Sequence, residues 1–119
     1  MTVAGSPAEL ESRPRTVAIG TFDGVHVGHR AVLAAAAAGP SPTVVTFDPH
    51  PRAVLGGEVS LLATLERRLE LFADVGIEDV LVVEFTEETA SLTAEQFARD
   101  HLLAIGARTV AAGAGFRFG

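Results

Sequence analysis

The sequence predicts an α/β fold in which a mostly parallel sheet is covered by helices on both faces. Strand-like and helix-like segments alternate along the chain, which is the pattern of parallel sheets with helical crossovers. The strand segments are short apolar runs without polar alternation, as expected for strands buried on both faces. With 119 residues, 48% of them hydrophobic, the chain is long enough for one domain with its own core.

The charge balance limits the kinds of partner. Nine basic residues stand against 15 acidic ones, a formal net charge of −6. This argues against a nucleic-acid partner, which would require dense Lys and Arg. A small anionic ligand is still compatible, because backbone N–H groups can bind it.

The sequence also predicts a cytoplasmic protein with no membrane partner. It contains no cysteine, so disulfides and thiolate metal sites are excluded. Residues 1–14 lack the features of a signal peptide, and no segment approaches the roughly 20 apolar residues of a membrane span.

The first half of the chain is predicted to contain a flexible arm and two β-α units. Residues 1–14, rich in Gly, Pro and charges, predict the arm, and the domain is predicted to cover residues 15–119. The strands are expected over residues 16–20 and 43–47, and the helices over residues 28–38 and 63–74. The alanines of the first helix could alternatively form a low-complexity tract. The second helix carries Leu65, Leu69 and Phe72 on one face.

The second half continues the alternation. A strand is expected over residues 79–83 and another over residues 108–112. Between them, Thr93 and Gln96 form the capping-box pattern of a helix that ends near Gly106. Its core face is expected to include Phe97, Leu102 and Ile105.

The junction between the first strand and the first helix is the strongest candidate for a site. Glycines at 20, 24 and 28 allow a ligand to approach the backbone closely, and the following helix presents free N–H groups. The spacing matches neither the dinucleotide fingerprint nor the P-loop. It predicts a loop that binds nucleotide phosphates, with His26 and His29 acting on the reacting phosphate. Two alternatives are ordinary surface histidines and a zinc site completed by His50.

Two further loops follow predicted strands. His50 lies between Pro49 and Pro51, which restrict the residues before them to extended conformations. Asp48 and Asp23 could cap turns, or could contact Mg²⁺ or a ribose hydroxyl. At the last strand, Phe116 and Phe118 could pack in the core or form an apolar slot for a planar ring.

These residues resemble the bacterial FAD synthetases, the bifunctional riboflavin kinase/FMN adenylyltransferases. The first motif, Gly20 to His29, is similar to that family's G-x-F-D-G-x-H-x-G-H pattern. The resemblance continues in the T-F-D-P-H-P run at 46–51, the L-T-A-E-Q-F run at 92–97 and the closing G-F-R-F-G. It therefore covers nearly all of residues 15–119. The H-x-G-H element alone is shared with other nucleotidyltransferases and class I aminoacyl-tRNA synthetases.

The resemblance implies a Rossmann-like nucleotidyltransferase of the HIGH superfamily that transfers AMP from ATP to FMN. The products are FAD, in flavin cofactor biosynthesis, and pyrophosphate, and Mg²⁺ accompanies ATP. His26 and His29 would be catalytic. The implied nucleotide-binding residues are Gly20, Thr21, Phe22, Asp23, Gly24 and Gly28, and the implied flavin-binding residues are Pro49, His50, Pro51, Phe116 and Phe118.

Two departures from the family pattern lead to further expectations. Gly115 stands where the family usually has an acidic or amide residue. The family's later serine/threonine-rich motif with its arginine and the riboflavin kinase domain are not in this sequence, so we expect a partial domain that is incomplete at the C-terminus. If Gly119 is the true end of the chain, we expect weak or no FAD synthesis and no riboflavin kinase activity. The alternatives are a nucleotide-binding remnant without turnover and a related enzyme, such as a cytidylyltransferase, with another acceptor.

Overall fold

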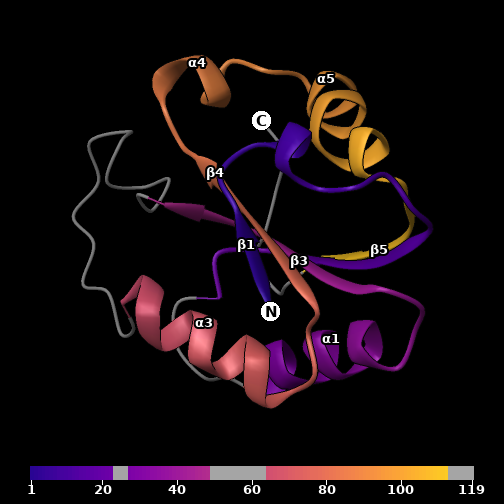
Figure 1. Cartoon of the computed structure of the whole chain (residues 1–119). Coiled ribbons are helices and arrows are strands. Elements are labelled where there is room, and N and C mark those ends of the chain that lie inside the picture. Colours follow the sequence, from indigo (N-terminus) through magenta and orange to yellow (C-terminus); the bar gives the residue numbers. More distant parts are fainter. Residues whose placement is uncertain (23–26, 49–63, 113–119) are drawn as a thin grey trace.

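A five-stranded parallel sheet forms the centre of the molecule (Figure 1). The computed structural model describes residues 1–22, 27–48 and 64–112, with the backbone alone for residues 27–29. The strands lie in the order β1-β4-β3-β2-β5, and every neighbouring pair is parallel. Their bounds are β1 Thr2–Ala4, β2 Arg15–Ile19, β3 Pro42–Asp48, β4 Asp79–Glu84 and β5 Ala107–Ala112.

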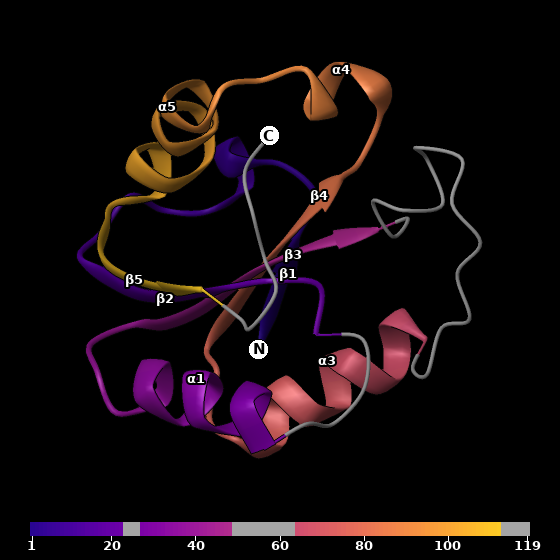
Figure 2. The same ribbon diagram turned by 180° about the vertical axis from the view of Figure 1, so that it is seen from behind.

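Helices cover both faces of the sheet, which gives three layers (Figures 1 and 2). One face carries α1 (Val27–Ala37) and α3 (Leu65–Asp74). The other carries α4 (Glu87–Ala90), α5 (Ala94–Phe97), the π-helical η2 (Ala98–Leu102) and the 3₁₀-helical η3 (Leu103–Ile105). A further 3₁₀ turn, η1 (Pro7–Glu9), follows β1. The predicted α/β class with a parallel sheet is therefore confirmed.

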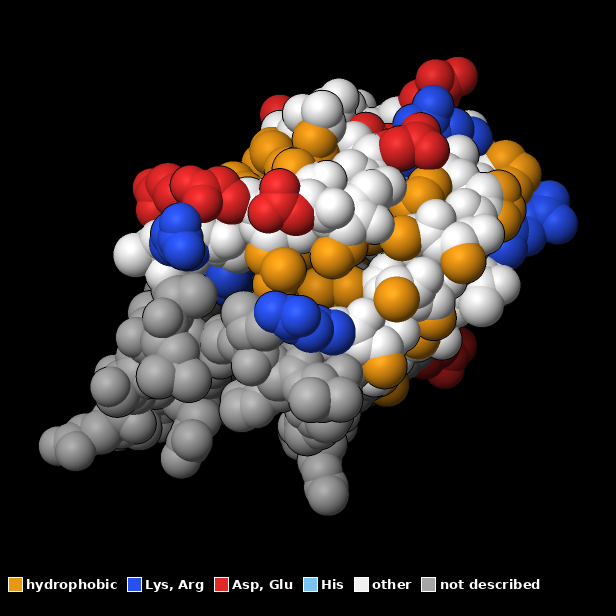
Figure 3. Space-filling view, turned by 90° about the horizontal axis from the view of Figure 1, so that it is seen from below, with side chains coloured by type: hydrophobic (Ala, Val, Ile, Leu, Met, Phe, Trp, Pro, Cys, Tyr) orange, Lys and Arg blue, Asp and Glu red, His pale blue; other side chains and the backbone are white. Residues whose placement is uncertain are grey.

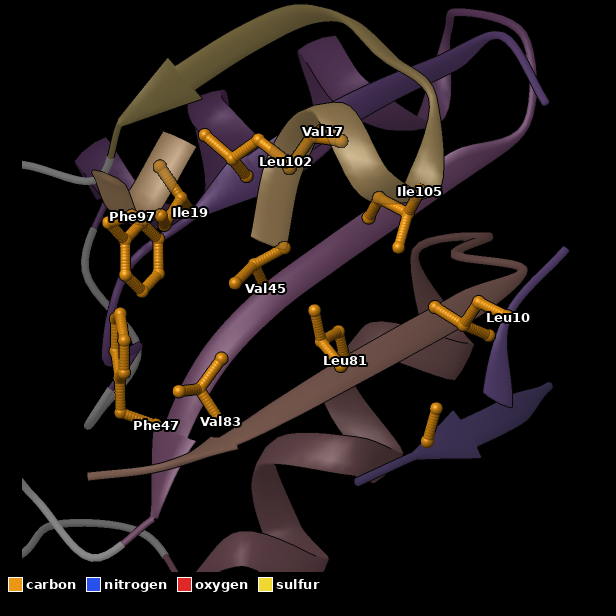
Figure 4. Packing of buried hydrophobic residues seen from close by; sticks show 11 residues of the cluster. Leu10, Val17, Ile19, Val45, Phe47, Leu81, Val83, Phe97, Leu102 and Ile105 are labelled. Carbon is orange, nitrogen blue, oxygen red and sulfur yellow. The ribbon is translucent and has the colours of Figure 1, made fainter. Parts of the chain in front are cut away.

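Each face of the sheet has its own apolar core. Under α5 and η2, the alternating strand residues Val17, Ile19, Val45 and Leu81 meet Phe97 and the other helical residues of the cluster (Figure 4). Under α1 and α3, the residues of the opposite face pack against the helices; this second cluster contains Ala18, Phe22, Leu33, Ala36, Val44, Phe72, Ile77 and Val80. The period of two along each strand therefore supplies both cores.

The outer surface of α1 and α3 carries both signs of charge. Acidic and basic side chains lie around and between hydrophobic ones, without a continuous basic patch on the part of this face that is described (Figure 3). No helix within the described ranges combines the length and the apolar character needed to span a bilayer.

The predicted elements agree with the structure to within a few residues, and the details differ at three places. The capping box of Thr93 and Gln96 is present with both of its hydrogen bonds. The helix that follows it continues first as a π-helical turn and then as a 3₁₀ turn before Gly106. On α3 the fully buried residues are Arg68 and Phe72. The short helix α4, capped by Thr86, was not predicted.

The prediction that residues 1–14 lack regular structure is wrong. Thr2–Ala4 form β1, an edge strand that pairs with β4 at Asp79–Leu81. Leu10 is buried in the core under α5. The segment also passes directly over Gly106, whose backbone has φ +87° and where a Cβ would lie 2.2 Å from the Arg13 carbonyl oxygen. The local composition suggested a loose arm, and it could not reveal these contacts because they are all long-range.

A buried ion cluster closes the amino ends of the strands. The Arg15 side chain is 1% exposed, and its Nη1 lies 2.6 Å from Asp79 Oδ2. The same guanidinium donates to Thr43 Oγ1, to the Ile105 carbonyl and to the Glu11 carbonyl. Arg13 Nη2 is a second partner of Asp79, also at 2.6 Å. Burial alone would raise the pKa of Asp79, but the hydrogen bonds and charges of Arg15 and Arg13 outweigh it and lower that pKa.

Asp79→Asn should destabilise the fold strongly, because it leaves the buried Arg15 charge without its counter-ion. We expect a loss of about 3–5 kcal/mol. Urea unfolding followed by far-ultraviolet circular dichroism measures it, since the chain has no Trp or Tyr for fluorescence. Glu70→Gln, which removes the exposed Arg67–Glu70 pair, is the control and should cost at most about 1 kcal/mol. Equal losses in the two variants would contradict the role of the cluster.

The same cluster should make the fold sensitive to acid. The folded-state pKa of Asp79 lies below the ordinary value of 3.8, so its stabilisation is complete above that pH and is lost as the pH falls through the folded-state value. Arg13→Met removes one of the two cations and should move the acid-unfolding midpoint to a higher pH. An acid titration followed by circular dichroism tests this, and an unchanged midpoint would show that Arg13 does not stabilise the carboxylate.

Candidate functional site at the carboxyl edge of the sheet

Three of the sequence motifs leave neighbouring strands at one edge of the sheet. Ile19, the last residue of β2, is paired with Val45 of β3 and with Ala112, the last residue of β5. The segments that follow β2, β3 and β5 therefore all begin at the carboxyl edge, around the central strand β2. The order of the strands also reverses there, since β3 and β4 lie on one side of β2 and β5 on the other. Parallel sheets bind their ligands at such a switch point.

The structure describes only part of the predicted site. Gly20, Thr21 and Phe22 are described in full, and Gly28 and His29 are placed by their backbone in the first turn of α1. The remaining predicted residues lie outside the described ranges: Asp23, Gly24, His26, Pro49, His50, Pro51, Phe116 and Phe118. Their roles stay predictions.

The first helix begins where the sequence predicted. α1 starts at Val27 and runs for 11 residues, so its amino end directly follows the glycine-rich junction. The free N–H groups of a first helical turn, with the positive end of the helix dipole, favour an anion. Gly20 is different, because its N–H donates to the Val45 carbonyl at 3.1 Å and so continues the sheet. Gly20 can give a ligand space, but its donor is already used.

The Phe22 side chain next to the junction is buried in the core under α1 and α3. Its ring is 1% exposed and meets the Phe72 ring edge-to-face, with 5.6 Å between centroids. Its backbone has φ +52°, the left-handed region that non-glycine residues rarely occupy. Such a conformation costs roughly 1–3 kcal/mol, which the burial of the ring must offset. The Phe22 side chain is thus a core anchor, and only its backbone is available to a nucleotide.

The Thr21 carbonyl is held by two donors from other elements. Thr46 Oγ1 donates to it at 3.1 Å, and Arg68 Nη1 donates to it at 2.8 Å. Neither side chain was predicted to belong to the site. Arg68 had a detectable signal, because it lies three residues after Leu65 and four before Phe72 and so falls on the apolar face of its helix.

Asp48 ends β3 with a half-exposed carboxylate at the same edge. Its Oδ1 lies 3.6 Å from Arg68 Nη2. Among the residues that the structure describes, no three His, Cys, Asp or Glu side chains gather as metal ligands. The zinc hypothesis depended on the side chains of His26, His29 and His50, none of which is among the described side chains.

A family model described as FAD synthetase matches residues 8–119. The chain belongs to the FAD synthetase family. It is 36% identical over 113 residues to the bifunctional riboflavin kinase/FMN adenylyltransferase of Listeria monocytogenes, covering 88% of this chain and 36% of that protein. It is 33% identical over 116 residues to a protein named FAD synthetase from the same organism, covering 92% of this chain and 47% of the relative. The chain thus spans less than half the length of either relative.

A solved structure supports the fold of this family member independently. A macrolide-efflux protein from Streptococcus pneumoniae superposes with a TM-score of 0.79, over 98% of this chain and 49% of that one. The two sequences are 24% identical, so the likeness bears on the fold alone.

The left-handed backbone at Phe22 can be tested by comparing alanine with glycine. Phe22→Ala should cost about 3–5 kcal/mol through the lost ring. Phe22→Gly should be the more stable of the two variants, by about 1 kcal/mol, because glycine adopts positive φ without strain. Leu33, fully buried within the right-handed α1, is the control. There the glycine variant should be the less stable one, by about 1 kcal/mol. Urea unfolding measures all four, and the same order at both positions would exclude a strained Phe22.

Proposed function

We propose that this chain catalyses the FMN adenylyltransferase reaction, the transfer of AMP from ATP to FMN. One observation carries the proposal beyond family membership: β5, β2 and β3 are adjacent, so three motifs start from one edge of the sheet. A nucleotide and a second substrate bound at these segments would meet above the end of β2. The next element along the chain after β2 is α1, which begins at Val27.

In the proposed step, an oxygen of the FMN phosphate attacks the α-phosphorus of ATP. The new oxygen–phosphorus bond forms as the bond to the bridging oxygen breaks, and pyrophosphate leaves with that electron pair. The FMN phosphate is already an anion near neutral pH, so the reaction needs alignment and charge stabilisation more than a strong base. ATP enters as its Mg²⁺ complex, and the metal neutralises phosphate charge.

The proposed roles divide between the three segments. His26 and His29 stabilise the charge that develops on the α-phosphate. The backbone from Gly20 to Gly24, with Gly28 in the first turn of α1, binds the nucleotide phosphates. The segment after β3, with Pro49, His50 and Pro51, and the one after β5, with Phe116 and Phe118, bound the flavin.

The decisive experiment mixes the chain with ATP, Mg²⁺ and FMN and detects FAD and pyrophosphate. His26→Ala and His29→Ala should each lower kcat by about 10²–10³-fold, the usual effect of removing one donor to transition-state charge. The KM for ATP should change far less, because the histidines act on charge that develops during the reaction.

His101→Ala is the matched control, since this histidine stacks on Phe97 in the layer formed by α5 and η2. Its kcat should stay within about twofold of the wild-type value. Nucleotide binding without any FAD would instead support a module that binds but does not turn over. Unchanged kcat in His26→Ala and His29→Ala would refute their catalytic roles.

A further inference from the structure

One buried guanidinium contacts both the residues that follow β2 and the last residues of β3. Arg68 lies on α3 and is 5% exposed. On the β2 side, its Nη1 donates to the Thr21 carbonyl at 2.8 Å. On the β3 side, the same nitrogen donates to Thr46 Oγ1 and to the Phe47 carbonyl, both at 3.2 Å, and Nη2 lies 3.6 Å from Asp48 Oδ1.

These contacts are mutually dependent. A buried cation is stable only while acceptors surround it, because desolvation is costly. Thr46 strengthens the dependence, since its hydroxyl accepts from Arg68 and also donates to the Thr21 carbonyl. A displacement of Asp48 or Phe47 therefore changes the position of the guanidinium, and with it the donor on Thr21.

The Thr21 carbonyl belongs to the peptide group that leads into the strained Phe22. The ring of Phe22 is fixed by Phe72, one helical turn beyond Arg68 on the same face of α3. Ring and carbonyl are thus both held by α3, and the backbone between them has little freedom. The positions of Thr21 and Phe22 therefore depend on contacts with α3.

We propose that Arg68 is a positioning residue that couples the residues after β2 to the last residues of β3. A change at the end of β3 reaches Thr21 and Phe22 through this guanidinium. Under the proposed function, on which this second step rests, the residues after β2 bind ATP, and the segment that continues from the end of β3 binds FMN. Arg68 then makes the affinity for one substrate depend on the occupancy of the other.

The coupling can be tested without any ligand. Asp48→Asn removes the charge facing Nη2, and the backbone amide resonances of Thr21 and Phe22 report the response in ¹⁵N-labelled protein. These resonances should shift in the wild-type background and should stay in place in the Arg68→Met background. Arg67→Met is the matched control, because Arg67 is exposed and pairs with Glu70 on the outer side of α3. It should leave the response intact.

Arg68→Lys serves if the methionine variant does not fold. Lysine keeps the charge but lacks the planar fork that reaches several acceptors at once, so the response should shrink without vanishing. Equal responses in the wild-type, Arg68→Lys and Arg68→Met backgrounds would overturn the proposal. So would the absence of any response at Thr21 in the wild type.

Binding measurements separate this inference from the proposed function. The affinity for a non-hydrolysable ATP analogue, measured by calorimetry with and without FMN, should differ by about 5-fold or more in the wild type. The ratio should fall toward one in Arg68→Lys without reaching it, while Arg67→Met keeps the wild-type ratio. If the amide resonances of Thr21 and Phe22 respond through Arg68 but the chain makes no FAD, the proposed function is refuted and the positioning role of Arg68 still holds. FAD synthesis with wild-type ratios and unchanged KM values in Arg68→Lys would refute the positioning role.

Discussion

The Arg15 guanidinium ties together four segments that are far apart in the sequence. It connects β2 to Thr43 of β3, to Asp79 of β4, to the carbonyl of Ile105 before β5 and to Glu11 in the amino-terminal segment. Because this charge is buried, the loss of any one segment leaves it less well compensated. The amino edge of the sheet is therefore fixed as a unit, and both helical layers are built on strands whose relative positions this cluster determines.

Arg68 has a different role at the carboxyl edge of the sheet. The acceptors of Arg15 are spread over the framework of the fold, whereas those of Arg68 are the last residues of β3 and the first residues after β2. Both groups are buried, but Asp48, the charged partner of Arg68, is half exposed and ends a strand. At the amino edge of the sheet, the arginines pair with the buried Asp79 carboxylate. At the carboxyl edge, a conformational change at the end of β3 alters the residues after β2 through Arg68.

The sequence predicted the elements well and their long-range contacts poorly. Strand and helix positions, the capping box at Thr93 and the start of α1 depend on local chemistry, so periodicity and turn residues were enough to find them. β1 could not be found in that way, because three residues with Gly and Pro nearby become a strand only by pairing with β4. For the site, the glycines and histidines were visible as a motif. Phe22 was expected among the ligand contacts, but its ring lies in the core. Arg68, on an apolar helix face, was not predicted to belong to the site.

The strand order also has a consequence for how the chain folds during synthesis. Arg15 meets Asp79 across 64 residues and the Ile105 carbonyl across 90, and the pairing of β1 with β4 spans a similar distance. The α1 and α3 units can form while translation continues, but the described long-range hydrogen bonds of residues 1–14 go to residues 78–81 and to Ile105, which are made later. Contacts between such distant residues form slowly, because the intervening loop must be closed first. Residues 1–14 are therefore expected to reach their native positions late in folding, although they are synthesised before the rest of the domain.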